Sequence, residues 1–441
     1  MPFGAERLAS LLDAADPRWR EARITVALSG GLDSTALLHA LASIAARELL
    51  ALRALHVDHG LQPQSAEWAA ACRAACQAAG IALEVIRLDL VPGRGESVEA
   101  VAREARYAAL AARLSDGERL VTAHHRDDQL ETVLIQLLRG AGVAGLAAMP
   151  ARAPLGRGWQ LRPLLGVDRS ELAEYAAQTG LSWRDDPMNA AQRFDRAYLR
   201  ERVLPAIRAR WPAASATVAR SAGHLAEASR LLAELAAGDA AAVLDDGRLT
   251  LSGLERLPRD RQVNLLRWWL RREGLRPPPA ARLAAALAGF FVARPDATPS
   301  LRWDAGEVRR YRGRLYALAP LPALRPPTPV GMPLELGAGL GRFRLVAGRE
   351  GGLRQDACEG AEIRFRAGGE ALQPHPARPR KRLKDLCQEA GIVPWMRDRL
   401  PLVFVGGRLA AVGDLWIDAE FAAPAGVAAL RPVWEGRPRI L

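Results

Sequence analysis

The first 210 residues predict an α/β fold, in which a parallel twisted sheet is flanked by helices. Two observations lead to this fold class. Apolar runs alternate with helical patterns along the segment, which is typical of parallel strands joined by crossover helices. Each run is also nearly continuous in apolar residues, as strands require when helices cover both faces of their sheet. Ligands of such sheets bind at the carboxyl ends of the strands, so functional residues are expected there.

The expected elements follow one another in order along this segment. Apolar runs predict the strands, and longer periodic or alanine-rich runs predict the helices between them. The expected strands are 23–31, 51–60, 81–90 and 119–125, and the expected helices are 33–49, 65–80, 97–114 and 127–140.

Three further segments follow the α/β domain of residues 1–210. A mainly helical, alanine-rich domain is expected at 211–318, and its last part, "RWDAGEVRRYRGRLYAL", predicts a short β-ribbon. A proline-rich linker region is expected at 319–354, and a small basic α+β domain at 355–441.

The charge of the chain favours an acidic partner. The formal net charge is +12, and Lys381 and Lys384 are the only lysines, so nearly all positive charge is arginine. The planar guanidinium suits bidentate contact with phosphate and stacking on bases. A basic surface that only confers solubility, or a genome composition that favours arginine, would give the same numbers.

The four cysteines do not indicate a disulfide framework in a chain of this length. Cys72 and Cys76 lie four residues apart on an expected helix with no second pair nearby, so we interpret them as structural. No signal segment opens the chain, and no uncharged stretch approaches the ~18 residues that span a bilayer. We therefore expect a cytoplasmic protein that does not bind membranes.

A glycine-rich turn, Ser-Gly-Gly-Leu-Asp-Ser-Thr at 29–35, joins the first expected strand to the first expected helix. Backbone N–H groups and the positive end of the helix would converge there, and the glycines would let an anion approach closely. The alternative is that Asp33 or Ser34 only caps the helix, but a cap needs one such residue. The GxxxxGK[ST] phosphate loop is excluded because neither lysine follows a glycine.

Polar residues also end the second and fourth expected strands. Asp58 and His59 follow the second strand, where they would either contact a nucleotide or merely terminate the strand. After the fourth strand come His124 and His125 and then three acids, which are Asp127, Asp128 and Glu131.

The acids of this block have two interpretations. Asp128 and Glu131 fit a capping box, which would be purely structural. Asp127 and Glu131 share a helix face, and an opposite apolar face is expected to be buried, so that the acids point toward the cleft. That apolar face comprises Leu130, Val133, Leu134, Leu137 and Leu138. Clustered carboxylates beside a triphosphate suit Mg²⁺ or an ammonium group.

The helix expected at 97–114 presents Arg103, Arg106 and Tyr107 on one face. A role in binding an anion is one interpretation of the two arginines. An ordinary exposed ion pair between Glu99 and Arg103 is the alternative for the first of them.

The turn resembles the SGGxDS[ST] pyrophosphate loop of the PP-loop, or N-type, ATP pyrophosphatases. In that superfamily ATP is cleaved between its α and β phosphates, AMP is transferred to an oxygen of the substrate, and the loop retains pyrophosphate. Three other blocks narrow the resemblance to the tRNA(Ile)-lysidine synthetase family: VDHGL at 57–61, AREARY at 102–107 and HxxDDQxET at 124–132.

The resemblance covers nearly the whole chain. It continues through RGAGVAGL at 139–146, RPLL at 162–165 and residues 185–205, and returns at 365–370 and 383–405. One departure occurs at Ala197, because the family usually has an Arg-Asn pair where this chain has Arg196-Ala197.

This resemblance implies a two-step reaction that uses ATP and Mg²⁺. ATP would adenylate the C2 carbonyl oxygen of the wobble cytidine of the isoleucine tRNA with anticodon CAU. The ε-amine of free L-lysine would then displace AMP and give lysidine, which switches codon reading from AUG to AUA. The lysine amine has to be neutral to attack, so a carboxylate or phosphate oxygen must accept its proton.

We assign roles on this basis. The expected catalytic residues are Asp33, Asp127, Asp128, Glu131 and Arg106. The expected ATP contacts are Ser29, Gly30, Gly31, Leu32, Asp33, Ser34, Thr35, Asp58 and His59. Lysine or the target base would contact Arg103, Tyr107, His124 and Arg139, and Mg²⁺ would bind Asp127 and Asp128. The expected tRNA contacts are Arg196, Arg200, Arg364, Arg366, Lys381, Arg382 and Lys384, with Arg378 and Arg380 in the same basic stretch.

Two other functions remain open at this point. A tRNA thiolase would use the same loop, although such enzymes usually need catalytic cysteines or an iron–sulfur cluster. We expect Cys72 and Cys76 to lie on a helix away from the cleft. A nucleotide- or RNA-binding protein without turnover is the second alternative. An amidotransferase is disfavoured because no glutaminase segment is present. The sequence leaves monomer and homodimer equally open.

Overall fold

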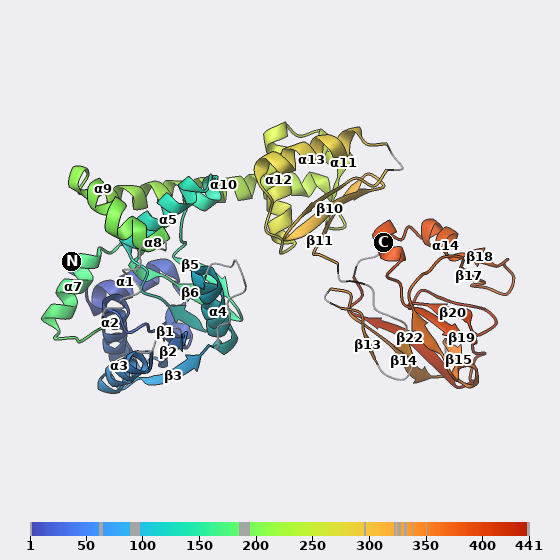
Figure 1. The fold of residues 1–441 in the computed structure, drawn as a ribbon, viewed down its shortest axis with the longest axis horizontal. Coiled ribbons are helices and arrows are strands. Elements are labelled where there is room, and N and C mark those ends of the chain that lie inside the picture. Colours follow the sequence, from blue (N-terminus) through green and yellow to red (C-terminus); the bar gives the residue numbers. More distant parts are fainter. Residues whose placement is uncertain are drawn as a thin grey trace. The chain divides into compact units, whose positions relative to one another are not determined.

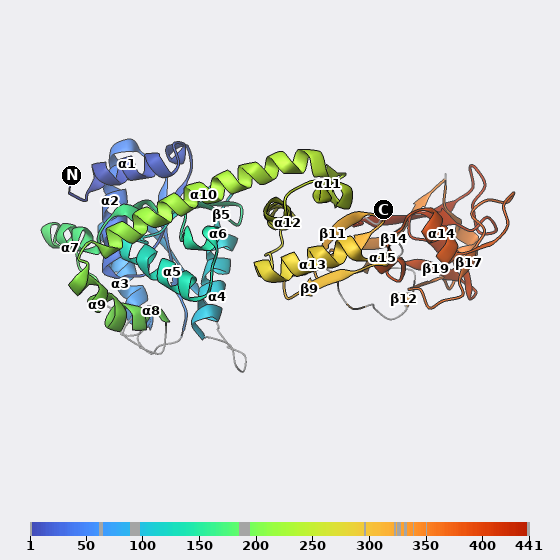
Figure 2. The same ribbon diagram turned by 90° about the horizontal axis from the view of Figure 1, so that it is seen from above.

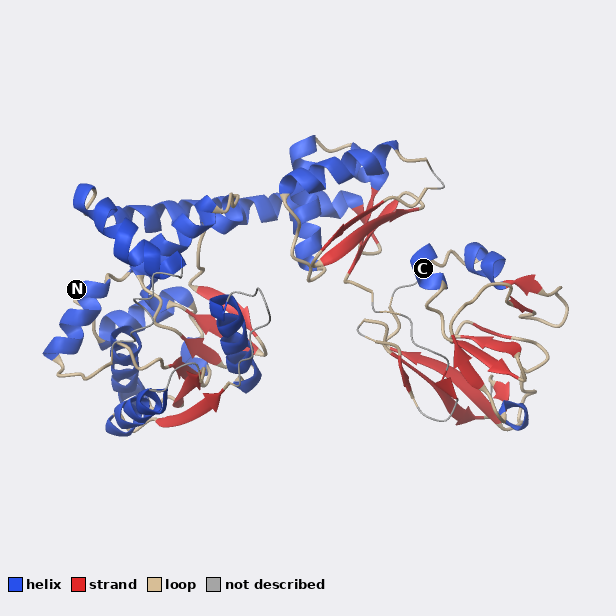
Figure 3. Cartoon of the chain, viewed as in Figure 1, coloured by secondary structure: helices blue, strands red, loops and turns tan. Residues whose placement is uncertain are grey.

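The computed structural model describes residues 2–60, 65–88, 98–184, 195–294, 297–321, 323, 328–329, 333–337, 339–349 and 351–438. The chain divides into two compact units, Met1–Leu232 and Ala233–Leu441, and each is described by itself (Figures 1 and 3). Leu61 of the VDHGL block, and residues 185–194 of the family-like segment 185–205, lie outside the described residues. The four-domain division proposed above stays a prediction.

The first unit is built on a six-stranded sheet with strand order β3-β2-β1-β4-β6-β5. Its strands are β1 (Ile24–Ala27), β2 (Leu52–Asp58), β3 (Ala82–Arg87), β4 (Arg119–Val121), β5 (Arg152–Leu155) and β6 (Gly158–Leu161). Every neighbouring pair is parallel except β5 and β6, which form an antiparallel hairpin at one edge. The predicted parallel sheet is therefore confirmed. The hairpin was not predicted, because strands of four residues leave too short a pattern.

Helices cover both faces of this sheet, which explains why every residue of β1 is buried. One apolar core joins β1 to α1, α2, α3 and α7, and a second core joins Leu110 and Leu114 at the end of α4 to Leu55 and Leu120. The principal helices of the unit are α1 (Ala5–Ala15), α2 (Leu32–Glu48), α3 (Ser65–Ala78), α4 (Val98–Arg113), α5 (Arg126–Leu138) and α7 (Arg169–Gln178).

Several short helices and one long helix complete the unit. They are η1 (Trp19–Glu21), α6 (Val143–Leu146), η2 (Pro163–Gly166), α8 (Asp195–Tyr198), the π-helical turn η4 (Leu199–Val203), α9 (Leu204–Arg210) and the part of α10 (Ala214–Val243) before Ala233, where the second unit begins. The first half of α10 runs beside α5 and α6 (Figure 2), and a cavity of about 760 Å³ lined mostly by alanine and glycine lies between them.

The predicted orientation of α5 is only partly confirmed, because Leu130 is buried as expected but the end of the apolar face is not. Leu137 and Leu138 are 56% and 80% exposed, whereas Glu131 is fully buried at 0% exposure. The reason is that arginines of residues 196–208 form hydrogen bonds and ion pairs with the polar face of the helix. Helical periodicity defines two faces, but it does not say which of them other segments will cover.

The second unit begins with an antiparallel five-stranded sheet of order β7-β8-β11-β10-β9. Its strands are β7 (Leu244–Asp245), β8 (Arg248–Thr250), β9 (Ser300–Trp303), β10 (Gly306–Tyr311) and β11 (Arg314–Leu318), and its helices are α11 (Leu251–Glu255), α12 (Arg259–Arg272) and α13 (Ala280–Val292). Trp269 and Phe290 are the largest side chains of their common core. The predicted β-ribbon corresponds to β9, β10 and β11, so this expectation is confirmed.

The remaining residues form three small sheets of orders β12-β16-β19-β20-β21, β13-β14-β22-β15 and β17-β18. The strands are β12 (Thr328–Pro329), β13 (Leu334–Glu335), β14 (Arg342–Gly348), β15 (Leu353–Arg354), β16 (Glu362–Arg364), β17 (Ala371–Leu372), β18 (Lys381–Arg382), β19 (Leu402–Val405), β20 (Arg408–Val412), β21 (Trp416–Ile417) and β22 (Ala429–Glu435). The helices are η5 (Gln355–Cys358), α14 (Leu383–Glu389) and α15 (Pro394–Arg397). Within the described part of the chain, no helix is both long and apolar enough to cross a membrane.

Candidate active site

The glycine-rich turn lies between β1 and α2, at the carboxyl edge of the sheet. Gly30 has a φ of 87°, a backbone conformation that residues with a side chain rarely adopt, and Gly31 is the residue before the helix. The hydroxyls of Ser34 and Thr35 both donate to the carbonyl oxygen of Gly31, at 3.1 and 3.0 Å. Internal hydrogen bonds therefore hold the turn in shape and leave backbone N–H groups of the helix start for an anion.

Cys72 lies directly against this turn, contrary to the expectation that it is distant from the cleft. A Cβ added to Gly30 would stand 3.1 Å from the Cys72 sulfur, so the thiol fills the space that the missing side chain leaves. Burial raises the pKa of Cys72 to about 12 and that of Cys76 to about 11. Thiols that stay protonated are poor nucleophiles, which supports the interpretation of both cysteines as structural. Only the position predicted for Cys72 was wrong.

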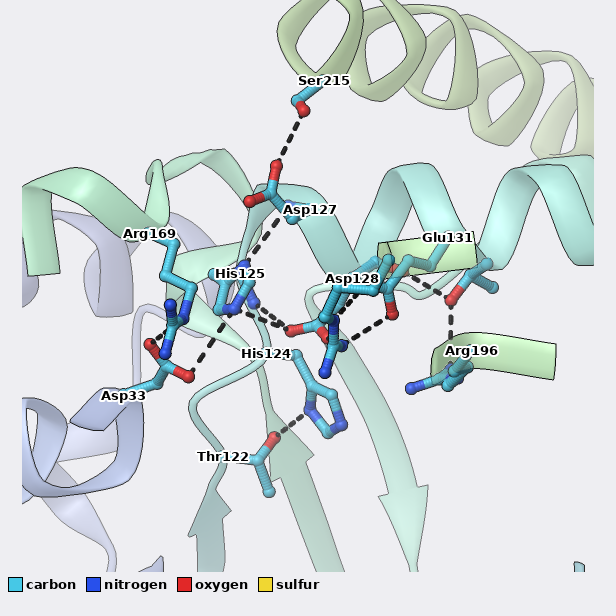
Figure 4. A network of polar contacts seen from close by, with 12 residues as sticks. Asp33, Thr122, His124, His125, Asp127, Asp128, Glu131, Arg169, Arg196 and Ser215 are labelled. Atoms are coloured by element: carbon cyan, nitrogen blue, oxygen red, sulfur yellow. Dashed lines mark hydrogen bonds and ion pairs between the residues drawn. The ribbon is translucent and has the colours of Figure 1, made fainter. Parts of the chain in front are cut away.

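Asp33 links the turn to the residues after β4 (Figure 4). One oxygen, Oδ2, lies 3.7 Å from Nε2 of His125, and the other, Oδ1, lies 3.5 Å from Nε of Arg169, the first residue of α7. Oδ1 is buried and has no hydrogen bond. One oxygen of this carboxylate thus retains its capacity to bind another group.

His125 begins α5 and was not among the predicted site residues. Its Nδ1 accepts a hydrogen bond from the Asp127 backbone N–H at 3.3 Å, while Asp128 Oδ2 accepts one from the His125 backbone at 2.9 Å. The capping box therefore pairs His125 with Asp128, not Asp128 with Glu131 as the sequence suggested. Burial alone would lower the pKa of His125, but the carboxylates of Asp33 and Asp128 outweigh it and raise the pKa.

Asp127 points away from the other acids, toward α10 (Figure 4). Its Oδ1 accepts hydrogen bonds from the Ser215 hydroxyl and the Arg208 guanidinium, each at 2.7 Å. Burial would raise the pKa of Asp127, but these two partners lower it. The expected common face of Asp127 and Glu131 is therefore divided between two different sets of partners.

Glu131 forms a bidentate ion pair with Arg200. The Arg200 Nε and Nη2 atoms donate to the two carboxylate oxygens at 2.7 and 2.9 Å. Burial raises the pKa of Glu131 despite this partner. Arg196, one helical turn earlier, donates to the Thr132 hydroxyl at 3.3 Å, so both arginines assigned to tRNA also contact α5.

His124 points away from Asp33, toward the Thr122 hydroxyl at 2.9 Å (Figure 4). Burial, together with the nearby guanidiniums of Arg162, Arg106 and Arg103, lowers its pKa to about 3 against the opposing effect of Asp128. This imidazole is therefore neutral at physiological pH.

The other assigned residues are spread around the edge of the sheet. Arg103 lies over the Tyr107 ring at 5.2 Å, and Arg139 forms an exposed ion pair with Asp195 at 2.9 Å. Asp58 accepts a hydrogen bond from the Gly60 N–H at 2.9 Å, which is the strand-terminating arrangement considered as an alternative. The roles assigned to these residues stay predictions.

Comparison with known proteins explains this arrangement. Family models described as the PP-loop domain, the TilS substrate binding domain and the TilS substrate C-terminal domain match residues 5–207, 249–316 and 361–434. A curated tRNA(Ile)-lysidine synthase from Methylococcus capsulatus is 43% identical over 413 residues, which cover 90% of this chain and 92% of the relative. The chain belongs to the tRNA(Ile)-lysidine synthase family.

Further relatives of the same name agree with this membership. The synthase of Alkalilimnicola ehrlichii is 45% identical over 91% of both chains, and that of Pseudomonas aeruginosa is 45% identical over 92% of both. A solved U34-tRNA thiolase from Methanococcus maripaludis has 16% identity and a TM-score of 0.40, and covers 50% of this chain and 80% of its own.

The structure separates two kinds of cation in the C-terminal domain of this family member. Four of the predicted tRNA contacts are paired with acids: Arg364 with Glu362, Arg366 with Asp398, Arg380 with Asp418 and Lys381 with Glu389. Arg382 and Lys384 are exposed and have no ion pair within the described residues. Pairing of this kind depends on strand register and could not be read from the run of basic residues.

A magnesium ion fits the site through Asp33 better than through the predicted pair of Asp127 and Asp128. The described residues include no group of three or more His, Cys, Asp or Glu that would enclose a metal. Mg²⁺ commonly uses one or two carboxylates together with substrate phosphates. The unbonded Oδ1 of Asp33 suits that mode, whereas Asp127 already accepts from Arg208 and Ser215.

Sequence reasoning missed Arg169, Arg208 and Ser215, which contact Asp33 or Asp127 from α7, α9 and α10. These residues lie in ordinary helical patterns, and no local signal distinguishes them. His125 was noted after the fourth expected strand, but no role was assigned to it. A histidine directly before an acidic helix start is a usable signal for an N-cap.

Proposed function

We propose that this chain ligates L-lysine to C2 of the wobble cytidine of the isoleucine tRNA with anticodon CAU, in the cytoplasm. ATP is converted to AMP and pyrophosphate in the first step, which places AMP on the C2 oxygen of the cytosine. The ε-amine of lysine attacks C2 in the second step, and AMP leaves. Adenylation is needed because an amide-like carbonyl oxygen is a poor leaving group.

One observation supports this function above the alternatives. The pyrophosphate loop and the acidic block of α5 meet at a single point, where His125 lies 3.7 Å from Asp33 and 3.6 Å from Asp128. A protein that only bound nucleotide would have no need of an acidic group at the same place. A thiolase mechanism is disfavoured because burial raises the pKa of both cysteines near the loop.

The triphosphate would lie over residues 29–35, against the N–H groups at the start of α2. Asp33 would hold Mg²⁺ together with phosphate oxygens, and the bound ion would neutralise charge on the α-phosphate during adenylate transfer. Arg169 would then exchange its contact with Asp33 for one with the phosphates, since Asp33 and the phosphates compete for the same guanidinium.

The acids near the start of α5 would handle the amine. Asp128 is the carboxylate closest to His125 that is not neutralised by a bidentate partner. It would orient the lysine amine or accept its proton. Glu131 would act through Arg200, whose position it fixes with two hydrogen bonds.

The tRNA would be bound by both units, with the target base turned out of the anticodon loop. In the C-terminal domain the exposed and unpaired Arg382 and Lys384 are better candidates for phosphate contact than their ion-paired neighbours.

The decisive experiment incubates the protein with ATP, radiolabelled lysine and CAU-anticodon tRNA. Label is expected in the RNA, with one AMP and one pyrophosphate formed per lysine incorporated. Reactions without ATP, and with a tRNA whose wobble base is uridine, are the controls. Formation of ADP, or label that enters RNA without ATP, would refute the proposal.

A further inference from the structure

Near His124 lies a group of guanidiniums, those of Arg103, Arg106 and Arg162, with no acidic ion-pair partner among the described residues. Arg162 directly follows β6, and only 9% of the residue is exposed. Its Nη1 donates to the Pro150 carbonyl at 2.9 Å, and its Nη2 donates to the Gln160 side-chain oxygen at 2.5 Å. Both acceptors are neutral, so the charge of Arg162 is not balanced by either of them.

The Nε atom of Arg162 is buried and has no hydrogen-bond partner. Arg106 is half-buried, and no ion pair joins it or Arg162 to an acid within the described residues. Burial lowers the pKa of both arginines, the nearby Tyr107 opposes this effect only in part, and Arg103 adds to it. Buried cations without a counterion are unfavourable, so this group is suited to an anionic ligand.

A chain of polar side chains fixes the orientation of Arg162. The Gln160 amide accepts from Arg162 through its oxygen and donates to the Thr122 hydroxyl at 3.1 Å through its nitrogen. Thr122 in turn contacts His124. A hydrogen bond from Gln160, together with the surrounding guanidiniums, outweighs burial and lowers the pKa of Tyr107. The guanidinium is therefore held in place before any ligand arrives.

The charges around His124 identify the class of ligand. The guanidiniums of Arg162, Arg106 and Arg103 and the carboxylate of Asp128 all lie close enough to His124 to affect its pKa, and their effects have opposite signs. An α-amino acid presents a carboxylate and an ammonium together and matches both signs, whereas an RNA phosphate would be repelled by Asp128. The small exposed fraction of Arg162 also suits the end of a small molecule better than a polymer backbone.

We propose that Arg162, with Arg106 beside it, binds the α-carboxylate of the lysine substrate. This inference rests on the proposed function. β4 lies between β6 and β1 in the sheet, so a lysine held at Arg162 extends its side chain across the end of β4 toward the loop after β1. Its ε-amine then reaches the region where the adenylated base is formed, and Arg162 determines specificity for amino acids over simple amines.

The test compares L-lysine with L-lysinamide, which lacks the carboxylate, in the wild type and in Arg162→Gln. The wild type is expected to use lysinamide with a kcat/KM about 10- to 100-fold lower. Arg162→Gln is expected to lose a similar factor for lysine and little for lysinamide, so that its discrimination largely disappears. The KM values for ATP and tRNA should stay within about twofold of wild type.

Arg157→Gln is the matched control, because Arg157 lies in the same hairpin but forms an exposed ion pair with Asp116. Arg162→Lys retains the charge and should keep part of the discrimination. A merely structural role of Arg162 would reduce turnover of both substrates equally.

Three results would overturn the proposal. They are equal use of lysine and lysinamide by the wild type, undiminished discrimination in Arg162→Gln, and a change confined to tRNA affinity and its salt dependence. If Arg162→Gln fails to fold, the wild-type comparison and Arg162→Lys still decide. Failure of the proposed function would be distinct, since the wild type would then incorporate no lysine at all.

Discussion

His124 and His125 are neighbours in the chain, yet their side chains lie in opposite electrical surroundings. His125 faces Asp33 and Asp128, which raise its pKa. His124 faces Thr122 and a group of guanidiniums, and burial lowers its pKa to about 3. Because successive side chains of an extended segment point to opposite sides, two adjacent residues reach two different regions.

The difference shows how the site compensates its charges. On the acidic side the protein itself supplies partners, since Arg200 pairs with Glu131 and Arg208 with Asp127. On the basic side no such partner exists for Arg106 and Arg162 among the described residues. We infer that the protein itself compensates Glu131 and Asp127 on the acidic side, whereas Arg106 and Arg162 on the basic side are compensated by a ligand.

The largest effect is expected for Asp33→Asn. Loss of the carboxylate nearest the loop should lower kcat for lysidine formation by at least about 10²- to 10³-fold, because Asp33 would no longer hold the Mg²⁺ that compensates charge on the transferring phosphate. The affinity for tRNA should stay within about twofold. Asp116→Asn, which alters an exposed acid paired with Arg157, is the control. Weak tRNA binding with normal turnover of each bound complex would contradict the assignment.

Arg200→Ala should produce the next largest effect, this time on stability. It leaves the fully buried Glu131 without its partner, and we expect a loss of about 3 kcal/mol in the free energy of unfolding, measured in urea. Adding Glu131→Gln to the Arg200→Ala variant should restore part of the lost free energy of unfolding, because the buried carboxylate is replaced by a neutral amide.

Two controls sharpen this result. Arg139→Ala breaks an exposed ion pair and should cost less than about 1 kcal/mol. Arg162→Gln should cost less than Arg200→Ala, because it leaves only neutral hydrogen-bond acceptors, and no buried charge, without a partner. Equal destabilisation by Arg162→Gln and Arg200→Ala would remove the distinction between the two sides.

A smaller effect is expected for the pH dependence of stability in His124→Gln. The pKa of His124 is lowered from 6.5 to about 3 in the folded protein, so the unfolded chain binds the proton more readily. The contribution of the neutral His124 side chain to the free energy of unfolding is therefore complete above pH about 6.5, and it is lost as the pH falls toward about 3. The wild type should lose up to about 1.4 kcal/mol more per pH unit than the variant in this range.

The measurement for His124 is urea unfolding at several pH values between 5 and 7.5. His224→Gln, which alters an exposed histidine of α10, serves as the control. A slope that is the same in the wild type and in His124→Gln would show that His124 is not held neutral by its surroundings.

The smallest effect concerns the cations of the C-terminal domain. Replacing both Arg382 and Lys384 by alanine should reduce the slope of log K for tRNA against log salt by about 1.5, as expected for two phosphate contacts. Replacing the ion-paired Arg380 and Lys381 should change it less. The reverse order would mean that ion pairing does not separate tRNA contacts from structural cations.

Much of the fold could be predicted from the sequence because it depends on local patterns. Alternating apolar runs gave the parallel sheet, and the seven-residue turn gave the position of the loop between β1 and α2. The partners of the acids could not be predicted in this way. Asp127 and Glu131 are four residues apart on one helix, but Ser215 and Arg200 bind them from segments about 70 to 90 residues away.

The sequence alone determined the phosphate loop, the acidic block after the fourth strand and the family of the protein, since these are short motifs in fixed local contexts. Only the tertiary structure decided that Glu131 is buried, that Asp127 turns toward α10 and that Arg162 lies without a counterion. The physical reason is that burial and charge compensation depend on distant segments that pack together. A local pattern specifies which side chains share a face, but not what that face will meet.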